Sequence, residues 1–189
     1  MTSLRRGFVA LVPSAAALDH VEGAVAPARA ALPRLRWTPR AQWHVTLQFL
    51  GRVVDTDSVT DALRRAVAAN EEFVARVGGG GVFANARAGT VLWLGVTEGR
   101  DAMTALARSL VRATEPFGVA REDRPFRPHL TVARAARPTD LRAAVAALDS
   151  SGRGPEWTAS EVVLFESDTR ADGAVHTEIA RFPLTPRSR

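Results

Sequence analysis

Two short segments far apart in the chain carry nearly the same pattern, His-x-Thr. His44 and Thr46 lie in HVTLQFLG at residues 44–51, and His129 and Thr131 lie in HLTVAR at residues 129–134. Both segments are apolar and β-branched, which predicts strands. Because side chains alternate between the two faces of a strand, each His shares a face with its Thr. Each segment is therefore expected to present one imidazole beside one hydroxyl.

Two such imidazoles facing one cleft would suit phosphoryl transfer. An in-line displacement at phosphorus needs a base on the attacking oxygen and an acid on the leaving oxygen. His serves either role near neutral pH, because its unperturbed pKa is about 6.5. Thr46 and Thr131 could donate hydrogen bonds to phosphate oxygens. A single His in an apolar strand is more often a packing residue, but packing does not explain two His-x-Thr strands at matching positions.

A zinc site is the main chemical alternative for the two His. The chain has no Cys, no His-Glu-x-x-His pattern and no carboxylate within the motifs, so the usual third ligand is missing. We therefore expect no metal and no cofactor. The four glycines at 78–81 are followed by no Lys-Ser/Thr and by no helix start, so they predict a flexible hairpin rather than a phosphate-binding loop.

The elements around the motifs recur at a spacing of 85 residues, which carries His44 onto His129 and Phe8 onto Trp93. Apolar periodicity predicts strand, helix, strand and helix at 5–12, 18–32, 43–51 and 58–67. The same order returns up to a helix over 139–148, and two strands, 161–167 and 174–182, close the chain. We predict an internal duplication: two similar lobes related by a pseudo-two-fold axis, each presenting one His-x-Thr strand.

Three helix details can be predicted from local signals. Ser58, with Asp61 three residues later, is expected to cap one helix, and Thr139 is expected to cap another. Pro27 is expected to kink or end the first helix.

The composition excludes several classes of protein. The 189 residues are 46% hydrophobic and 24% charged, as in a folded domain, and the absence of Cys excludes disulfides. Apolar stretches fall short of the ~20 residues that span a bilayer, and Asp19 and Glu22 interrupt the N-terminal apolar run, which argues against a secretion signal. We expect a cytoplasmic monomer. The net charge of +5 permits a polyanionic partner without requiring one.

The segments WHVTLQFLG (43–51) and FRPHLTVAR (126–134) resemble the signature of the 2H phosphoesterases. The closer resemblance is to their LigT-like branch, the bacterial and archaeal RNA 2′,3′-cyclic phosphodiesterases also described as 2′-5′ RNA ligases. It runs from RGFVALVPS (6–14) to EVVLFESDTRADGAVHTEIARFPL (161–184). It implies one LigT-like domain over 1–189, a bilobal α+β fold with two antiparallel sheets around a central cleft and flanking helices. The implied activity is metal-independent hydrolysis of a terminal RNA 2′,3′-cyclic phosphate to a 2′-phosphate, with reversible 2′-5′ ligation as a further activity.

The resemblance also implies roles for individual residues. His44 would protonate the leaving 3′ oxygen, and His129 would activate water. Thr46, Thr131 and Arg134 would bind the phosphate, although regular alternation places Arg134 opposite His129, so that the strand must end or twist there. The last strand of the family usually has a Tyr where this chain has His176, and we expect His176 to be a surface or packing residue.

Weaker candidates lie around the motifs. Phe8 and Phe49 could stack on a base, although aromatic residues at such places are more often core. Arg127 is a candidate RNA contact within two basic clusters, one before each motif, that would attract RNA; the clusters contain Arg34, Arg36 and Arg40, and Arg121, Arg124 and Arg127. Two alternatives remain open: a phosphodiesterase for a small cyclic nucleotide, which pocket size would decide, and an RNA-end-binding module without catalysis.

Overall fold

One antiparallel sheet runs through the whole molecule. The computed structural model describes residues 3–83, 85–120, 122–170 and 173–187. The strands are β1 (Leu4–Leu11), β2 (Arg36–Trp37), β3 (Val45–Val53), β4 (Phe73–Val82), β5 (Gly89–Glu98), β6 (His129–Thr139), β7 (Trp157–Ala159), β8 (Glu161–Arg170) and β9 (Gly173–Pro183). Their order across the sheet is β7-β4-β5-β6-β3-β1-β8-β9, with β2 paired to β6. The longer helices are α1 (Ala15–Ala31), α2 (Thr56–Ala68), α3 (Arg100–Thr114) and α4 (Arg142–Ser150), and the short 3-10 helices are η1 (Arg40–Gln42), η2 (Ala86–Ala88) and η3 (Glu115–Phe117).

The sheet divides into two halves where β3 meets β6. These two strands pair at a single position, Val45 with Leu130, whereas β1 pairs with β3 and β5 pairs with β6 over most of their lengths. The α+β class is confirmed. The two predicted sheets are these halves, β3-β1-β8-β9 and β7-β4-β5-β6, which the β3–β6 junction links into one curled sheet.

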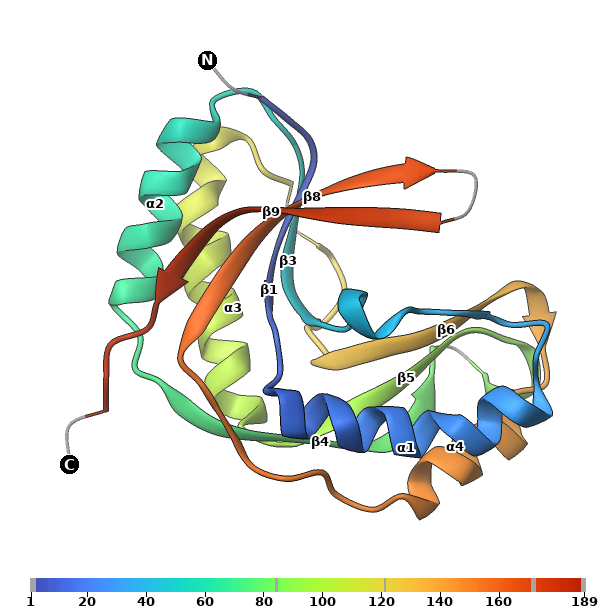
Figure 1. Ribbon diagram of the computed structural model, residues 1–189. Coiled ribbons are helices and arrows are strands. Elements are labelled where there is room, and N and C mark those ends of the chain that lie inside the picture. The colour runs from blue at the N-terminus through green and yellow to red at the C-terminus, as the bar shows by residue number, and fades with distance from the viewer. Residues whose placement is uncertain (1–2, 84, 121, 171–172, 188–189) are drawn as a thin grey trace.

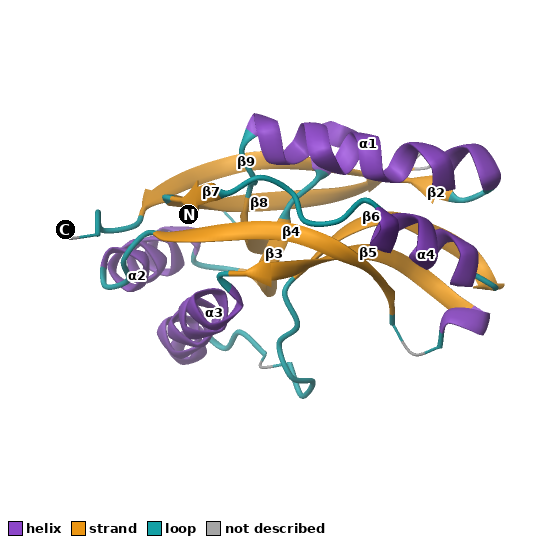
Figure 2. Ribbon diagram, turned by 90° about the horizontal axis from the view of Figure 1, so that it is seen from below, coloured by secondary structure: helices purple, strands orange, loops and turns teal. Residues whose placement is uncertain are grey.

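Helices α1 and α3 cross between the halves. Helix α1 follows β1 but packs on α4, over β4 of the other half, and α3 follows β5 but packs on α2 and β3 (Figures 1 and 2). Adding 85 to the bounds of β1, α1 and β3 gives 89–96, 100–116 and 130–138, close to those of β5, α3 and β6. This correspondence supports the inferred duplication. One continuous apolar cluster runs through both halves.

Two predicted helix caps were wrong, and the first helix does not end at Pro27. Helix α2 begins at Thr56 and is capped by Asp55, whose carboxylate accepts a hydrogen bond from the Ser58 backbone N–H at 3.1 Å. Thr139 still pairs with Gly89 as the last residue of β6, so α4 starts only at Arg142. Helix α1 continues through Pro27, which is exposed, so water can bind the carbonyl group that loses its partner.

The four glycines do not form a flexible hairpin. Residues 78–81 lie inside β4. A Cβ on Gly80 would lie 2.6 Å from the Val145 carbonyl oxygen of α4, and a Cβ on Gly81 would overlap the ring of Trp93. The glycines therefore allow a helix and a large aromatic ring to approach the strand closely, which a run of glycines in a sequence does not reveal.

No helix in the described part of the chain is long and apolar enough to cross a membrane.

Candidate active site

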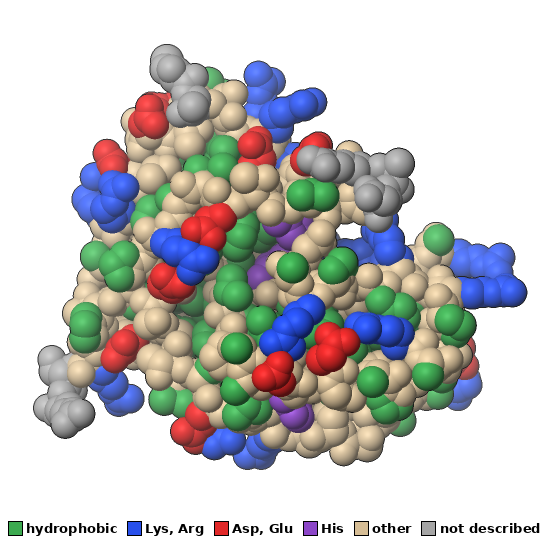
Figure 3. Space-filling view, in the orientation of Figure 1, with side chains coloured by type: hydrophobic (Ala, Val, Ile, Leu, Met, Phe, Trp, Pro, Cys, Tyr) green, Lys and Arg blue, Asp and Glu red, His purple; other side chains and the backbone are tan. Residues whose placement is uncertain are grey.

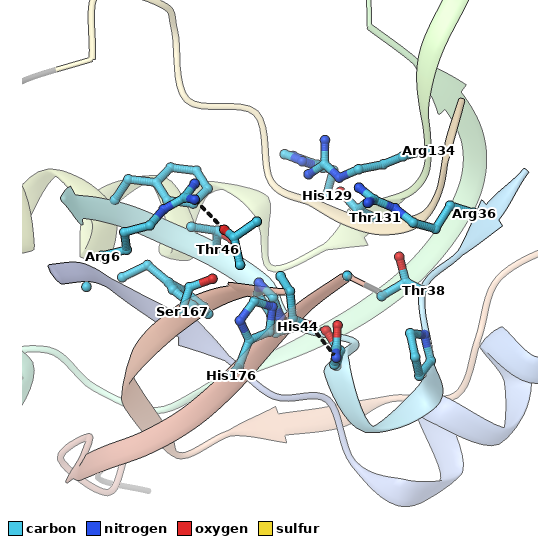
Figure 4. A pocket seen from close by; sticks show the side chains of 18 of the residues that line it. Arg6, Arg36, Thr38, His44, Thr46, His129, Thr131, Arg134, Ser167 and His176 are labelled. Atoms are coloured by element: carbon cyan, nitrogen blue, oxygen red, sulfur yellow. Dashed lines mark hydrogen bonds between the residues drawn. The ribbon is translucent and has the colours of Figure 1, made fainter. Parts of the chain in front are cut away.

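A cleft of about 760 Å³ opens where the two halves of the sheet meet. The structure brings all five of the principal predicted residues to this cleft: His44, Thr46, His129, Thr131 and Arg134 (Figure 4). In Figure 3, His side chains (purple) show near the centre of the face, with Arg side chains (blue) to their right, and a further His patch lies near the lower edge. The cleft is therefore lined by imidazole, hydroxyl and guanidinium groups from both halves.

A β-bulge in each motif strand decides which side chains face the cleft. In β3, Thr46 and Gln48 pair with adjacent residues of β1, so Leu47 is the extra residue; in β6, Val132 is the extra residue opposite β5. Each bulge turns two successive side chains inward, and the next one returns to the cleft. Arg134 lies at that position in β6. The strand therefore does not end at Arg134; the bulge is the local irregularity that returns this side chain to the cleft.

The same position in β3 is occupied by Phe49. Residues 49 and 134 are 85 apart, so the two bulged strands present different side chains at equivalent places. Phe49 lines the cleft with 54% of its surface exposed. The cleft is therefore pseudo-symmetric in its backbone and asymmetric in its chemistry.

Both motif imidazoles are held by backbone carbonyl groups. Nδ1 of His44 lies 2.8 Å from the carbonyl oxygen of Gln42, and Nδ1 of His129 lies 2.7 Å from that of Arg127. Because a carbonyl oxygen only accepts, the proton of each neutral ring must be on Nδ1. The Nε2 lone pair of each ring is then free to take a proton from a ligand in the cleft.

Burial lowers the pKa of both motif imidazoles. The pKa of His44 falls to about 4, chiefly because burial disfavours the charged ring, with smaller effects from His176, His129 and Arg134. The pKa of His129 is also lowered, again chiefly by burial and then by Arg134 and Arg127. In the empty cleft both rings are therefore mostly neutral at neutral pH.

Aromatic side chains support each imidazole. The ring of Phe8 lies 4.9 Å from that of His44 and stacks on Phe165 at 5.1 Å, while Phe83 meets His129 edge-on at 4.7 Å. Phe8 is only 3% exposed, so it supports His44 from behind and has little surface for a base. Of the two predicted stacking residues, only Phe49 offers an open face.

His176 packs beside His44, at the surface of the cleft, where we had expected a surface or packing residue without placing it near the motif strands. It lines the cleft from β9, and its ring meets that of His44 nearly edge-on, with 5.4 Å between the centroids. Its place beside His44 could not be predicted, because a lone His in a strand gives no signal of which distant residues it will contact.

The arginines near the cleft fall into two groups. Arg36 pairs with Arg134 across β2 and β6, both line the cleft, and neither forms an ion pair with a carboxylate among the described residues. The remaining cluster residues lie outside the lining: Arg40 binds Asp19 at 2.7 Å, the Arg127 guanidinium lies 4.5 Å from the ring centre of Trp93, Arg34 and Arg124 are exposed, and Arg121 lies outside the described residues.

Some cleft residues escaped sequence analysis. Arg6 lines the cleft and donates a hydrogen bond to the Thr169 hydroxyl at 2.5 Å, and Gln42 donates one from its amide to the carbonyl oxygen of Ala174 at 2.6 Å. The sequence gives no reason to select Arg6 and Gln42, because an Arg at the start of a strand and a Gln in a loop are usually solvated. No three His, Asp or Glu side chains within the described ranges come together as a group that could hold a metal ion.

The fold and the paired His-x-Thr strands define the class of this protein as a 2H phosphoesterase. A model of the 2′-5′ RNA ligase superfamily matches residues 13–171. The chain belongs to the 2′-5′ RNA ligase superfamily.

Related proteins support this assignment. An RNA 2′,3′-cyclic phosphodiesterase of Methanothermobacter thermautotrophicus is 30% identical over 184 residues, which cover 95% of this chain and 98% of that protein. One of Geobacillus stearothermophilus is 28% identical over 185 residues, 94% of this chain but only 56% of that protein. The chain thus spans about half the length of some relatives and nearly all of others.

Solved structures agree on the fold. A Thermus thermophilus protein superposes with a TM-score of 0.73 at 26% identity, covering 97% of this chain and all of that one. Escherichia coli LigT complexed with 3′-AMP superposes with a TM-score of 0.70, covering 96% of this chain and 99% of that one. At 22% identity the likeness to LigT concerns the fold alone.

Proposed function

We propose that this protein is a metal-independent RNA 2′,3′-cyclic phosphodiesterase that hydrolyses a terminal cyclic phosphate to a 2′-phosphate. One observation carries the proposal: two imidazoles, each held through Nδ1 by a backbone carbonyl, line one cleft with two Thr hydroxyls and Arg134. The names of the Methanothermobacter and Geobacillus relatives support the choice of substrate.

In this reaction one imidazole takes a proton and the other gives one. Nε2 of His129 takes a proton from water as the water oxygen bonds to phosphorus, and Nε2 of His44 gives a proton to the 3′ oxygen as the bond between phosphorus and that oxygen breaks. The products are a 2′-phosphate and a 3′-hydroxyl. Thr46, Thr131 and Arg134 donate hydrogen bonds to the non-bridging phosphate oxygens, where negative charge develops.

The low pKa values have a consequence for this mechanism. The reaction needs one charged and one neutral imidazole, whereas the empty cleft favours two neutral rings. A cyclic phosphate is an anion, and an anion close to an imidazole raises the imidazole's pKa. The acid therefore acquires its proton together with the substrate, and the lowered pKa values of the two rings do not by themselves assign the roles of His44 and His129.

The cations of the cleft support an RNA substrate. Arg36 and Arg134 lie side by side, Arg6 comes from the other half of the sheet, and Phe49 has an open face for a base. A small cyclic nucleotide remains the alternative substrate, because the cleft admits a single nucleotide as readily as the end of a chain. Reversible 2′-5′ ligation, the cytoplasmic location and the monomeric state remain predictions.

The direct experiment uses the purified chain after exhaustive chelation. It is incubated with an oligoribonucleotide ending in a 2′,3′-cyclic phosphate and, separately, with 2′,3′-cyclic mononucleotides. We expect hydrolysis of the oligonucleotide to a 2′-phosphate end and unchanged activity with EDTA. Faster turnover of the mononucleotides would favour the small-nucleotide enzyme, binding without turnover would favour the RNA-end-binding module, and a requirement for one divalent ion would contradict the mechanism.

A further inference from the structure

We propose that His176 is a substrate-binding residue that presents Nε2–H to the cleft, in the opposite tautomer to His44 and His129, and donates a hydrogen bond to a phosphate oxygen beside His44. The identity of the phosphate rests on the proposed function. The tautomer and the ability to bind an anion do not.

The placement of the ring carries the first step. The His176 ring meets Phe8 edge-on at 4.9 Å and His44 edge-on at 5.4 Å, and Figure 4 shows it beside His44 in the cleft. The side chain of Gln42, whose backbone carbonyl holds His44, binds the carbonyl of Ala174, two residues before His176. The same residue therefore fixes both imidazoles relative to each other.

The two nitrogens of His176 lie in different surroundings. Nδ1 is buried and has no hydrogen-bond partner among the described residues, whereas Nε2 is not among the buried atoms that lack a partner. The ring lines the cleft, so Nε2 is the nitrogen that a ligand can reach. This arrangement differs from that of His44 and His129, in which Nδ1 is bound to a carbonyl.

The tautomer follows from this difference. A neutral imidazole has one N–H, and a buried N–H without an acceptor is rarer in proteins than an under-satisfied acceptor. Burial also lowers the pKa of His176, so the neutral ring is favoured. The proton therefore belongs on Nε2. An Nε2 lone pair would, in addition, point at the anion that the Arg side chains of the cleft attract.

The three imidazoles then have complementary functions. His44 and His129 present lone pairs that accept and return protons, while His176 presents an N–H donor that takes no part in the proton transfers. A donor in a partly buried cleft stabilises the charge that develops on a phosphate oxygen without competing for the protons in transfer.

The tautomers can be measured directly. Two-bond proton–nitrogen correlation spectra of the nitrogen-15-labelled chain, at a pH well above the ordinary His value of about 6.5, distinguish Nδ1–H from Nε2–H rings. The chain has 4 His, so assignment by single substitution is practical. We expect Nδ1–H for His44 and His129 and Nε2–H for His176; an Nδ1–H ring at His176 would overturn the proposal.

Substitutions test the contact. His176→Gln places an amide N–H near the Nε2 position, His176→Phe keeps the ring shape without a donor, and His176→Asn has an amide too short to reach. We measure the affinity for inorganic phosphate and kcat/KM with the cyclic-phosphate oligonucleotide. Both should fall about 10-fold to 100-fold in the His176→Phe and His176→Asn proteins, the usual value of one hydrogen bond to a charged group. The His176→Gln protein should keep most of the wild-type affinity and rate. His20→Phe is the matched control, because His20 also has a buried, unpaired ring nitrogen but lies outside the cleft lining.

Each outcome decides the proposal. If the His176→Gln protein binds and reacts as weakly as the His176→Phe protein, His176 transfers a proton or only packs. If the His176→Phe protein binds and reacts as well as the wild type, His176 makes no hydrogen bond to the ligand. If Phe disrupts folding, as the melting temperature would show, Asn provides the same test. A wild-type protein that binds phosphate through His176 but hydrolyses no cyclic phosphate would refute the proposed function and leave this inference intact.

Discussion

At the scale of single residues, two carbonyl groups determine the chemistry of the cleft. The carbonyls of Gln42 and Arg127 hold Nδ1 of His44 and His129, and they make Nε2 the only ring nitrogen able to exchange a proton with a ligand. Both carbonyls are backbone groups, so the tautomer of each ring depends on the backbone conformation just before each motif strand.

The lowered pKa values predict an acidic optimum for kcat/KM. The competent free enzyme has one charged and one neutral imidazole, so the profile should be bell-shaped, with one limb near pH 4 from His44 and the other below the ordinary His value of about 6.5. The limbs of kcat should lie at higher pH, because the bound anion raises both pKa values. Steady-state rates over a pH series check this, and kcat/KM that still rises above neutral pH would contradict it.

At the scale of elements, glycines and bulges place the cleft side chains. Gly81 leaves room for the Trp93 ring, which lies 6.1 Å from that of His129, and the bulges at Leu47 and Val132 return Phe49 and Arg134 to the cleft. The positions of catalytic atoms therefore depend on residues that do no chemistry.

We predict that Gly81→Ala destabilises the protein and lowers activity. Its Cβ would overlap the Trp93 ring, which must move together with the surroundings of His129, and such overpacking costs about 1–3 kcal/mol. Gly23→Ala is the control: it lies in α1 with nothing within 4 Å of its Cβ, so Ala should stabilise the chain by about 0.5–1 kcal/mol. Denaturant unfolding and kcat/KM measure both effects; a Gly81→Ala protein as stable and active as the wild type would show that the close packing is unnecessary.

At the scale of the whole molecule, the cleft concentrates positive charge and buries neutral imidazoles. The net charge is only +5, yet Arg6, Arg36 and Arg134 all line one cleft. This local excess, rather than the overall charge, is what an RNA end would meet.

Arg36→Ala should therefore weaken binding of an oligonucleotide substrate more than it affects the chemical step. We expect KM to rise about 3-fold to 10-fold at low salt. The slope of log KM against log salt concentration should fall by about 1, the change expected for the loss of one phosphate contact. Arg34→Ala is the matched control, an exposed Arg two residues away that lies outside the cleft lining. Equal effects of the two substitutions in a salt series would mean that the cleft does not direct the RNA.

The buried imidazoles also predict how stability depends on pH. The folded-state pKa of His44 lies below its unfolded value, so the unfolded chain binds more protons between about pH 6.5 and pH 4, and the free energy of unfolding should fall as the pH drops through this window. Because His44→Gln removes one such group, its loss of stability over the same window should be smaller. Urea unfolding at several pH values tests this; parallel curves for the two proteins would argue against a buried neutral His44.

The sequence predicts the helices and strands of this structure, but it does not predict the side-chain positions that depend on contacts with distant segments. Apolar periodicity and the 85-residue spacing predict the α+β elements and the two His-x-Thr strands, because periodicity is a local property. The bulge that brings Arg134 to the cleft depends on the register with β5, and the place of His176 depends on the Gln42–Ala174 contact, so neither can be read from its own segment. The prediction of a flexible hairpin at 78–81 was wrong because glycine is common both in flexible loops and at positions where other atoms pack closely against the backbone.

The central claim is that His44 and His129 act as acid and base on one phosphorus atom, and the measurement that tests it most directly compares leaving groups. On a cyclic-phosphate substrate, either Ala substitution should lower kcat/KM by about 10²-fold to 10⁴-fold. On a nitrophenyl phosphodiester, whose leaving group needs no proton, His44→Ala should regain much of the lost rate, while His129→Ala should not, because water must still be deprotonated. Rescue of His129→Ala alone would reverse the two roles, and near-normal activity of both variants on the cyclic phosphate would contradict the two-histidine mechanism.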